Sequence, residues 1–198
     1  MADDVAGRGL RERKKERTRR TIRERAFSLF RAQGYAATTV EQIAAAAAVS
    51  PSTFFRYFPA KEQLVLADHL AAPLIAEFRA QPPECSPLAA LRAAVRAVLR
   101  TLSPAELAFE RERHDLLYRT PELRSAIALE IERGVDMLTG LFAERLGRDP
   151  ADREVRVLAG AFVGAALVTV LGRPLDWRAL DSAMAQLEDG LRLGRSGG

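Results

Sequence analysis

Cysteine, histidine and tryptophan are scarce in this sequence, and long apolar runs are absent. The single cysteine, Cys85, excludes an internal disulfide, and two histidines are too few to build a zinc finger with it. No apolar run approaches the roughly 20 residues that a membrane-spanning helix needs, and Met1 to Leu10 lacks the apolar segment of a secretory signal. We therefore expect a cytoplasmic chain that needs no metal or cofactor and is stabilised by packing alone.

Signatures of enzymes are also missing. The sequence has no nucleophile with a base at a recognisable spacing, no glycine-rich phosphate loop and no cluster of metal-ligating side chains. We therefore expect that the protein is not an enzyme.

Basic residues gather in the first third of the chain. Residues 1–62 contain 13 Lys or Arg and 7 Asp or Glu, a balance of +6, whereas the remaining 136 residues carry 17 and 19, a balance of −2. A basic end joined to a slightly acidic body is typical of a nucleic-acid-binding module attached to a second domain. The charge alone leaves a solvated basic tail as the alternative.

The pattern of apolar residues predicts an all-α chain with about nine helices. Alternation of apolar and polar residues is scarce, while Ala, Leu, Arg and Glu dominate. Gly34 is expected to end the first helix, and pairs of a capping residue with proline mark later helix starts. The predicted helices span about 13–33, 40–47, 51–57 and 61–81, with a possible kink at Pro73, and further ones begin at Ser86, Ser103, Thr120, Asp149 and near Asp176, the last ending by Gly194.

Two short helices in the basic part are predicted to be joined by a tight turn. Thr39 resembles an N-cap, and Gln42 three residues later completes a capping box. Ser50 followed by Pro51 restarts a helix after only a few residues. This is the layout of a helix-turn-helix, whose second helix enters the major groove of DNA.

The same region resembles the DNA-binding signature of the TetR (tetracycline-repressor-like) family. The resemblance covers roughly residues 13–70 and rests on Thr38-Thr-Val-Glu-Gln-Ile-Ala followed by Val49-Ser-Pro-Ser-Thr-Phe-Phe-Arg-Tyr-Phe-Pro-Ala-Lys-Glu. It implies a homodimeric, ligand-responsive repressor that an apolar small molecule releases from a palindromic operator. The alternative is a helical sensor or enzyme that does not act on DNA, which would lack the steep salt dependence of DNA binding.

The resemblance also implies a division into domains. We expect a flexible basic arm at 1–12, a helix-turn-helix domain at 13–60, an effector-binding and dimerisation domain at 61–194, and a flexible tail at 195–198.

Side-chain chemistry divides the expected DNA contacts by role. Thr53 and Tyr57 offer hydroxyls to phosphates, and Thr39 caps a helix whose N-terminal amides can also face a phosphate. The resemblance places Lys61 on the DNA backbone. Base reading is expected mostly from Pro51, Ser52 and Arg56, of which Arg56 can bond guanine through two hydrogen bonds or bind a phosphate instead. Arg19 and Arg20 are expected to reach a flanking phosphate or the minor groove.

Two residues depart from the family pattern. Phe55 stands among the DNA-contacting residues where many members have a tyrosine, so one phosphate-binding hydroxyl is missing and Tyr57 is a candidate to replace it. Phe54, Phe55 and Phe58 are nevertheless expected in the core more than against bases. Ala48 stands where a turn glycine is usual, and a left-handed conformation there would cost about 1–2 kcal/mol.

The last two helices are the expected dimer interface. The resemblance places it at about 150–171 and 177–191. Small residues among apolar ones in the first of these helices would let a partner helix approach closely: Ala159, Gly160, Gly164 and Ala165. The alternative is the central helix of a monomeric core.

An effector pocket is expected within the middle helices, about residues 61–148. Leu107, Glu110, His114 and Leu117 share one helical face, and His114 is expected to be a core histidine with satisfied hydrogen bonds more than a ligand contact. The charged run 110–113 is interpreted as a solvated face. The candidate ligand-binding residues, each of which could be plain core, are Phe78, Phe109, His114, Leu117, Tyr118 and Phe142. The segment from Arg113 to Leu123 is similar to regulators with an acyl-CoA-like ligand domain, beside which a generic lipophilic or cationic drug-like effector remains open.

Overall fold

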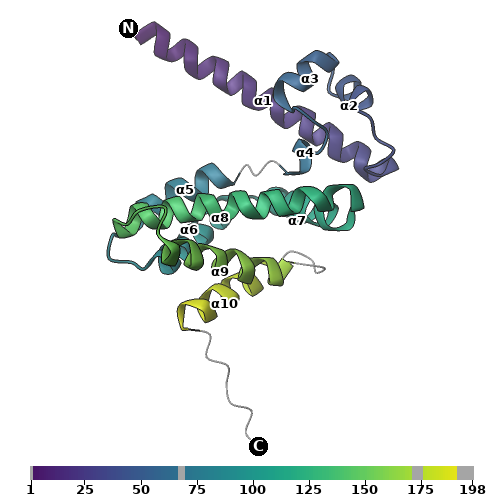
Figure 1. The fold of residues 1–198 in the computed structure, drawn as a ribbon. Helices are drawn as coiled ribbons and strands as arrows, with labels where there is room; N and C mark the ends of the chain where they lie inside the picture. Colours follow the sequence, from purple (N-terminus) through teal and green to yellow (C-terminus); the bar gives the residue numbers. More distant parts are fainter. Residues whose placement is uncertain (1, 67–69, 171–175, 191–198) are drawn as a thin grey trace, which may run out of the picture. The chain divides into compact units, whose positions relative to one another are not determined.

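The computed structural model describes residues 2–66, 70–170 and 176–190, and it confirms an all-α chain (Figure 1). Within these ranges there is no strand and no helix long and apolar enough to cross a membrane. The helices are α1 (Ala2–Gln33), α2 (Val40–Ala46), α3 (Pro51–Tyr57), α4 (Gln63–Leu66), α5 (Ala71–Ala80), α6 (Pro87–Thr101), α7 (Pro104–Arg119), a 3-10 turn η1 (Pro121–Leu123), α8 (Arg124–Leu146), α9 (Arg153–Val170) and α10 (Trp177–Glu188).

The chain divides into two compact units, Met1–Ala67 and Asp68–Gly198. In the first unit α1 packs against α2, and α2 packs against α3. The apolar face of α1 is buried at Ile22, Ala26 and Phe30, and Phe27 is buried beside Phe30. The spacing of these residues follows one side of a helix, so the short helices have a common surface on which to pack.

Both capping predictions in the first unit are confirmed. The Thr39 hydroxyl accepts a hydrogen bond from the Gln42 amide, and the Gln42 side chain accepts one from the Thr39 amide, which completes the capping box. The Ser50 hydroxyl accepts from the Thr53 amide, with Pro51 at the first helical position. Because these bonds satisfy amides that have no partner inside a helix, they fix where α2 and α3 begin.

The turn between α2 and α3 places Ala48 in the left-handed conformation, with φ of +54°. The amide of Val49 donates back to the Ala44 carbonyl across this turn. The side chain of an L-residue strains the backbone here, as expected from the missing glycine.

Replacing Ala48 with glycine should therefore stabilise the first unit. We expect Ala48→Gly to raise its free energy of unfolding by about 0.5–1 kcal/mol, since relief of the strain exceeds the added flexibility of the unfolded chain. Chemical denaturation followed by circular dichroism measures the change. Ala45→Gly inside α2 is the matched control and should lower stability by about 0.5–1 kcal/mol. Equal losses in both variants would contradict the strain at Ala48.

The second unit is a helical bundle in which α8 packs on α9, α9 on α10, and α5 on α6. Helix α6 also contacts α8 and α10, so apolar side chains from five helices meet in one core. Its largest fully buried residues include Phe78, Leu91, Phe142 and Met184. This core holds the helices around the cavity described below.

Several predicted helix limits differ from the structure. The single helix expected over 61–81 is α4 and α5, with Leu70 outside both helices. Pro73 lies in the first turn of α5, where a backbone N–H would have no acceptor inside the helix. The proline therefore marks the start of a new helix instead of a kink. Helix α1 begins at Ala2 instead of about Arg13.

Two later helix starts are also corrected. Asp149 forms a turn by accepting from the Ala151 amide, and α9 begins only at Arg153, where Asp152 accepts from the Glu154 amide. Thr120 and Pro121 begin the 3-10 turn η1, and Thr120 makes no side-chain cap. An aspartate before proline, such as Asp149, forms a turn as readily as a helix cap. This pair of residues alone therefore does not distinguish a turn from the start of a helix. Helix α10 ends at Glu188, and the predicted end at Gly194 lies outside the described residues, as does the predicted tail at 195–198.

Candidate DNA-binding surface and ligand cavity

Helix α3 presents one face to solvent and buries the other. Pro51, Ser52 and Arg56 are exposed, whereas Phe54 and Phe58 are fully buried. The expectation that all three phenylalanines of this helix belong to the core is wrong for Phe55, which is 49% exposed. Phe55 therefore adds a large apolar group to the exposed face of α3, where it can contact a ligand such as a thymine methyl.

Hydroxyl groups at the start of α3 are linked to one another. The Ser50 hydroxyl lies 2.9 Å from the Ser52 hydroxyl and donates to the Thr53 hydroxyl at 2.9 Å. These bonds hold the hydroxyls of Ser52 and Thr53 in defined positions in the free protein. This lowers the entropy cost of ordering the two side chains when they bind a partner.

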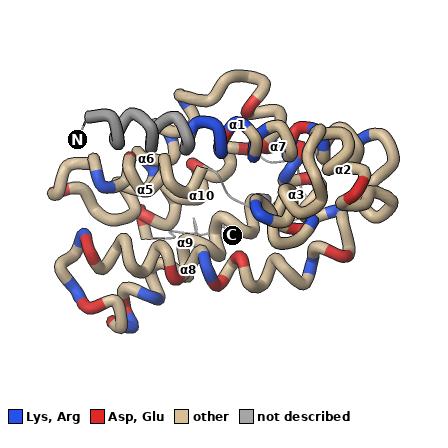
Figure 2. Tube along the Cα trace, turned by 90° about the horizontal axis from the view of Figure 1, so that it is seen from above, with Lys and Arg blue, Asp and Glu red and all other residues tan. Residues whose placement is uncertain are grey.

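Cationic side chains lie against aromatic rings in this unit. The Arg56 guanidinium is 5.4 Å from the centre of the Tyr57 ring, and that of Arg19 is 5.2 Å from the Phe58 ring. Arg20 is exposed on α1, where further Lys and Arg residues follow the helix (Figure 2). Ring contacts of this kind orient a guanidinium without neutralising its charge.

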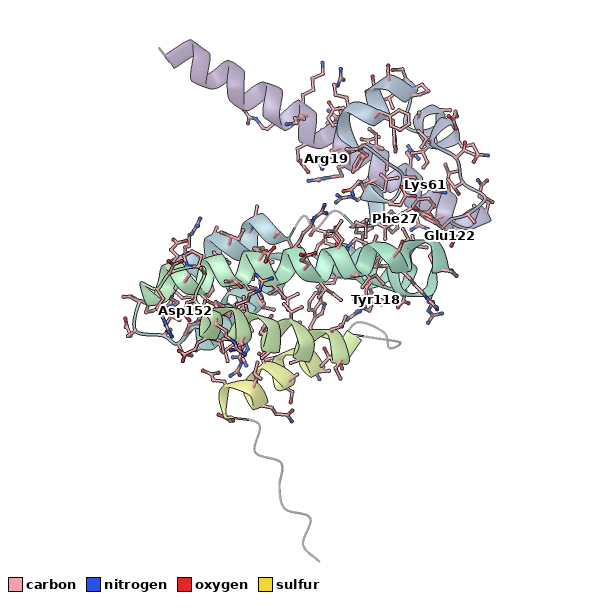
Figure 3. The ribbon with its side chains drawn as sticks, in the orientation of Figure 1. Arg19, Phe27, Lys61, Tyr118, Glu122 and Asp152 are labelled. Atoms are coloured by element: carbon pink, nitrogen blue, oxygen red, sulfur yellow. The ribbon has the colours of Figure 1, made fainter. Side chains whose placement is uncertain are left out.

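Lys61 (labelled in Figure 3) is bound inside the first unit. Its ammonium donates to the carbonyls of Tyr35 at 2.9 Å and Thr38 at 3.0 Å, and it lies 4.1 Å from the centre of the Tyr35 ring. Lys61 therefore braces the turn between α1 and α2, the turn that carries Thr39. Sequence reasoning placed this side chain on the DNA backbone and did not anticipate the brace, because it depends on residues 23 and 26 positions away in the chain.

Thr39 is exposed, and its neighbours are fixed by a hydrogen-bond network. The Gln33 side-chain amide donates to the Gln42 side chain at 2.8 Å and to the Ala37 carbonyl at 3.2 Å. The buried Thr38 hydroxyl donates to the Gly34 carbonyl at 2.7 Å. The turn before α2 is thus held from both sides.

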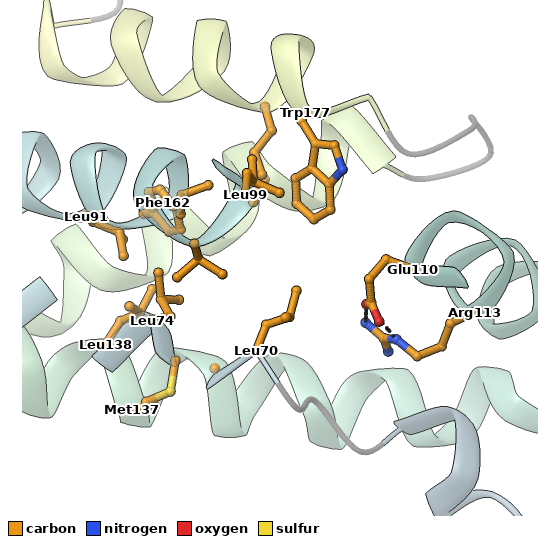
Figure 4. Close-up of a pocket in the computed structure, with 15 residues that line it drawn as sticks. Leu70, Leu74, Leu91, Leu99, Glu110, Arg113, Met137, Leu138, Phe162 and Trp177 are labelled. Carbon is orange, nitrogen blue, oxygen red and sulfur yellow. Dashed lines mark hydrogen bonds and ion pairs between the residues drawn. The ribbon is translucent and has the colours of Figure 1, made fainter. Parts of the chain in front are cut away.

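The second unit contains an apolar cavity of about 220 Å³ (Figure 4). Its lining comes from Leu70 and from helices α5 to α10 and is mainly apolar, with one ion pair and the only tryptophan of the chain. The lining residues are Leu70, Leu74, Leu91, Val95, Val98, Leu99, Glu110, Arg113, Gly134, Met137, Leu138, Phe162, Ala166, Trp177 and Leu180. The volume exceeds the roughly 150 Å³ of a cavity known to hold benzene, so the site can enclose a small apolar group.

The ion pair in the cavity wall joins Glu110 and Arg113 of α7. Arg113 donates to Glu110 through Nε at 3.0 Å and lies 2.9 Å from it through Nη2, while Glu110 is 1% exposed. The interpretation of residues 110–113 as a solvated face is therefore wrong for this pair. A charge in an apolar wall is tolerated when it is paired, so the two residues supply polarity without a net charge.

His114 lies beside Tyr118 on α7, with ring centres 4.5 Å apart. Burial lowers the pKa of His114 below its ordinary value and raises that of Tyr118. His114 is buried as expected, but neither nitrogen of its ring has a hydrogen-bond partner among the described residues, so the expectation of satisfied hydrogen bonds is wrong. Burial therefore favours the neutral imidazole, because its charged form loses hydration.

None of the six ligand-binding residues predicted from the sequence lines the cavity. Phe78 and Phe142 are buried with ring centres 6.0 Å apart, and the other four lie on α7: Phe109, His114, Leu117 and Tyr118. Sequence reasoning missed Trp177, which lies beyond the middle helices where the pocket was expected. Its position immediately after the Asp176 cap was the available signal.

Helix α9 has an apolar face on each side. Val155, Ala159 and Phe162 are buried in the core, so the expectation that Ala159 faces a partner helix is wrong. Val157 and Val168, by contrast, are 62% and 72% exposed. Ala161 and Gly164 lie between these two valines at helical spacing and are also exposed. We call Val157, Ala161, Gly164 and Val168 the α9 stripe, and a Cβ atom built at Gly164 would meet nothing within 4 Å.

A helix-turn-helix joined to a helical unit with an apolar cavity defines a ligand-responsive DNA-binding transcriptional regulator. Comparison with known proteins identifies which kind. Residues 22–67 match the bacterial regulatory proteins of the tetR family, and residues 85–192 match the MftR C-terminal domain. The chain belongs to the TetR family.

Named relatives support this assignment. The chain is 39% identical over 153 residues to the HTH-type transcriptional regulator TcmR of Streptomyces glaucescens, covering 74% of this chain and 68% of that protein. It is 27% identical to the putative mycofactocin biosynthesis transcriptional regulator MftR of Mycobacterium tuberculosis, covering 78% and 79%. The relatives are regulators of transcription and not enzymes, as the sequence predicts.

A solved structure has the same fold. Thermus thermophilus FadR, a TetR-family transcriptional repressor in complex with lauroyl-CoA, is similar over 91% of this chain and 99% of its own, with a TM-score of 0.55 and 26% identity.

Proposed function

We propose that two copies of this chain form a repressor that binds a two-fold symmetric operator and is released when an apolar ligand enters the cavity of the second unit. The cavity is the observation that carries this proposal. It is apolar over most of its wall, its lining comes from Leu70 and from helices α5 to α10, and it contains one paired charge. Binding sites for small molecules have this composition of apolar lining with few polar groups.

The similarity to Thermus thermophilus FadR supports an acyl chain as the apolar group, since that protein binds lauroyl-CoA. At about 220 Å³, the cavity is smaller than the roughly 300–1,000 Å³ of sites that enclose drug-sized ligands. It therefore suits an acyl chain or a compact ring system, with any large polar part of the ligand outside.

The exposed face of α3 supports the assignment of DNA contacts. Arg56 is its long cation and is proposed to read a base, with Pro51, Ser52 and Phe55 beside it in the groove. Thr53, Tyr57, Thr39, Arg19 and Arg20 are proposed to contact phosphates. Lys61 is proposed to act mainly by bracing the turn before α2, although an ammonium has three N–H donors and only two are used on carbonyls.

The α9 stripe supports a homodimer. Apolar residues at helical spacing on an exposed face are typical of a surface that another helix covers. The small residues Ala161 and Gly164 would allow the partner's helix to approach closely. The alternative of a monomeric core helix is disfavoured, because Val157 and Val168 are exposed in the single chain.

Release from DNA requires that the ligand bind one arrangement of the regulator better than the other. A ligand with equal affinity for both arrangements changes nothing. A shift from 1:99 to 99:1 needs about 5.5 kcal/mol of differential binding, which two equivalent cavities in a dimer would share.

Trp177 provides a direct test because it is the only tryptophan and lines the cavity. An operator selected from random-sequence DNA is labelled, and lauroyl-CoA is titrated while Trp177 emission and operator anisotropy are followed together. We expect both signals to change over the same ligand concentrations. Val95→Phe fills the cavity and should abolish both changes while operator binding remains. Saturable quenching of Trp177 with unchanged operator affinity would show that binding and release are not coupled.

A further inference from the structure

A second hollow of about 540 Å³ lies on the surface of α6 and α10, directly outside the cavity. The two hollows share Leu99 and Trp177, and Figure 4 shows these two residues on the same side of the cavity. The outer hollow, which we call the arginine groove, is lined by Arg96, Leu99, Arg100, Trp177, Arg178, Asp181, Ser182 and Ala185. A ligand passing between Leu99 and Trp177 would therefore reach from an apolar interior to a charged exterior.

The arginine groove has an excess of positive charge. Three arginines face one carboxylate, and Asp181 is already bound by Arg96 through two hydrogen bonds of 2.8 and 2.6 Å. The hydrogen bond from Arg96 lowers the pKa of Asp181, so its charge persists at neutral pH. Among the described residues, Arg100 and Arg178 form no ion pair, which leaves two exposed guanidinium groups for an anion.

The charged pair in the cavity wall has no such preference. Arg113 is occupied by Glu110 at 2.9 Å, and the pair has no net charge. An anion placed there would compete with a buried carboxylate for the same guanidinium and lose its hydration as well. The arginine groove is therefore the favoured end for a negative group.

Trp177, which lines both hollows, carries a buried polar atom. The indole nitrogen of Trp177 is buried and has no hydrogen-bond partner among the described residues. An indole N–H is a donor only, and buried donors are rarely left without an acceptor.

We propose that the effector is an amphiphile with an anionic head, whose apolar chain fills the cavity and whose head binds Arg100 and Arg178 in the arginine groove. The inference rests on the proposed function for occupancy of the cavity and adds the class of the ligand and the position of its head. The head is a phosphate or a carboxylate, since both form paired hydrogen bonds with guanidinium groups.

The test compares ligands that share one chain and differ in the head. Dodecyl phosphate, laurate and dodecanol are titrated below their micelle concentrations, with Trp177 emission as the signal. We expect at least one anion to bind about tenfold more tightly than dodecanol at low salt, a difference of ~1.4 kcal/mol. This advantage should shrink as salt is raised, because exposed charges are screened. The stronger of the two anions identifies the head.

Variants locate the head. The double variant Arg100→Gln, Arg178→Gln should bind the anion about tenfold more weakly than the parent protein does, while its affinity for dodecanol stays unchanged. Arg119→Gln with Arg124→Gln is the matched control, because both residues are exposed arginines of the same unit that line neither hollow. Arg100→Glu with Arg178→Glu should reverse the preference, so that dodecyltrimethylammonium binds more tightly than dodecyl phosphate.

Different failures have different meanings. Equal affinity for dodecanol and both anions, or equal losses in the glutamine variants and their control, would overturn the position of the head while leaving an apolar effector in place. Failure of every dodecyl compound to bind would overturn the inference together with acyl-chain occupancy of the cavity.

Discussion

Gly164→Leu should convert the regulator from a dimer to monomers and abolish its binding to a two-fold operator. The glycine lies within the α9 stripe, and the leucine side chain has room in the single chain, since nothing lies within 4 Å of a Cβ at this position. In a two-fold interface the change occurs twice, and overpacking costs about 1–3 kcal/mol each time. We expect the dissociation constant of the dimer, measured by analytical ultracentrifugation, to rise by about 30-fold or more.

The matched control places the same side chain elsewhere. Ala128→Leu adds a leucine at an exposed position of α8 and should leave the dimer intact. The helical content of Gly164→Leu by circular dichroism should equal that of the parent protein. A soluble Gly164→Leu protein that remains dimeric would place the dimer interface on another surface.

Arg56→Ala should weaken binding to the selected operator by about 1–3 kcal/mol for each half-site and relax the base preference at one position. The reason is its position on the exposed face of α3, where the Tyr57 ring orients the guanidinium. Competition between the operator and single-base variants of it, at fixed salt, measures both effects. The loss should be smaller for random DNA, to which Arg56 offers only charge.

Arg25→Ala removes the same charge from an exposed position on α1 and serves as the control. It should weaken binding to all DNA sequences by the same factor, because it changes only the long-range attraction to phosphates. If Arg56→Ala also weakens all sequences equally, Arg56 binds the backbone, and base reading belongs to Phe55, Ser52 and Pro51.

Local signals explain what sequence reasoning predicted well. The Thr39 capping box, the Ser50-Pro51 start of α3 and the strained turn at Ala48 each depend on residues within a few positions of one another. Such interactions act in the same way wherever the segment lies in the fold. The same short stretch carries the family resemblance, so the amino-acid sequence alone indicates the class of protein.

Helix limits were predictable only where the local signal had one meaning. Ser86 and Ser103 cap α6 and α7 as predicted, and Glu106 completes a second capping box with Ser103. Asp149 before Pro150 forms a turn instead, and Pro73 lies in the first turn of α5. In both cases the same residues are compatible with two backbones, and packing of the neighbouring helices selects one.

The sequence by itself determined the helical class, the helix-turn-helix and the basic character of its unit, because these depend on composition and on contacts between near neighbours. Only the tertiary structure decided that Lys61 braces the turn before α2, that Phe55 is exposed, and that Trp177 lines the cavity. Helical periodicity shows which residues of α7 face inward, but a cavity exists only where the facing helices leave a gap. Glu110 and Arg113 line that gap and His114 does not, since this depends on side chains from α5, α8 and α10 that lie far away in the chain.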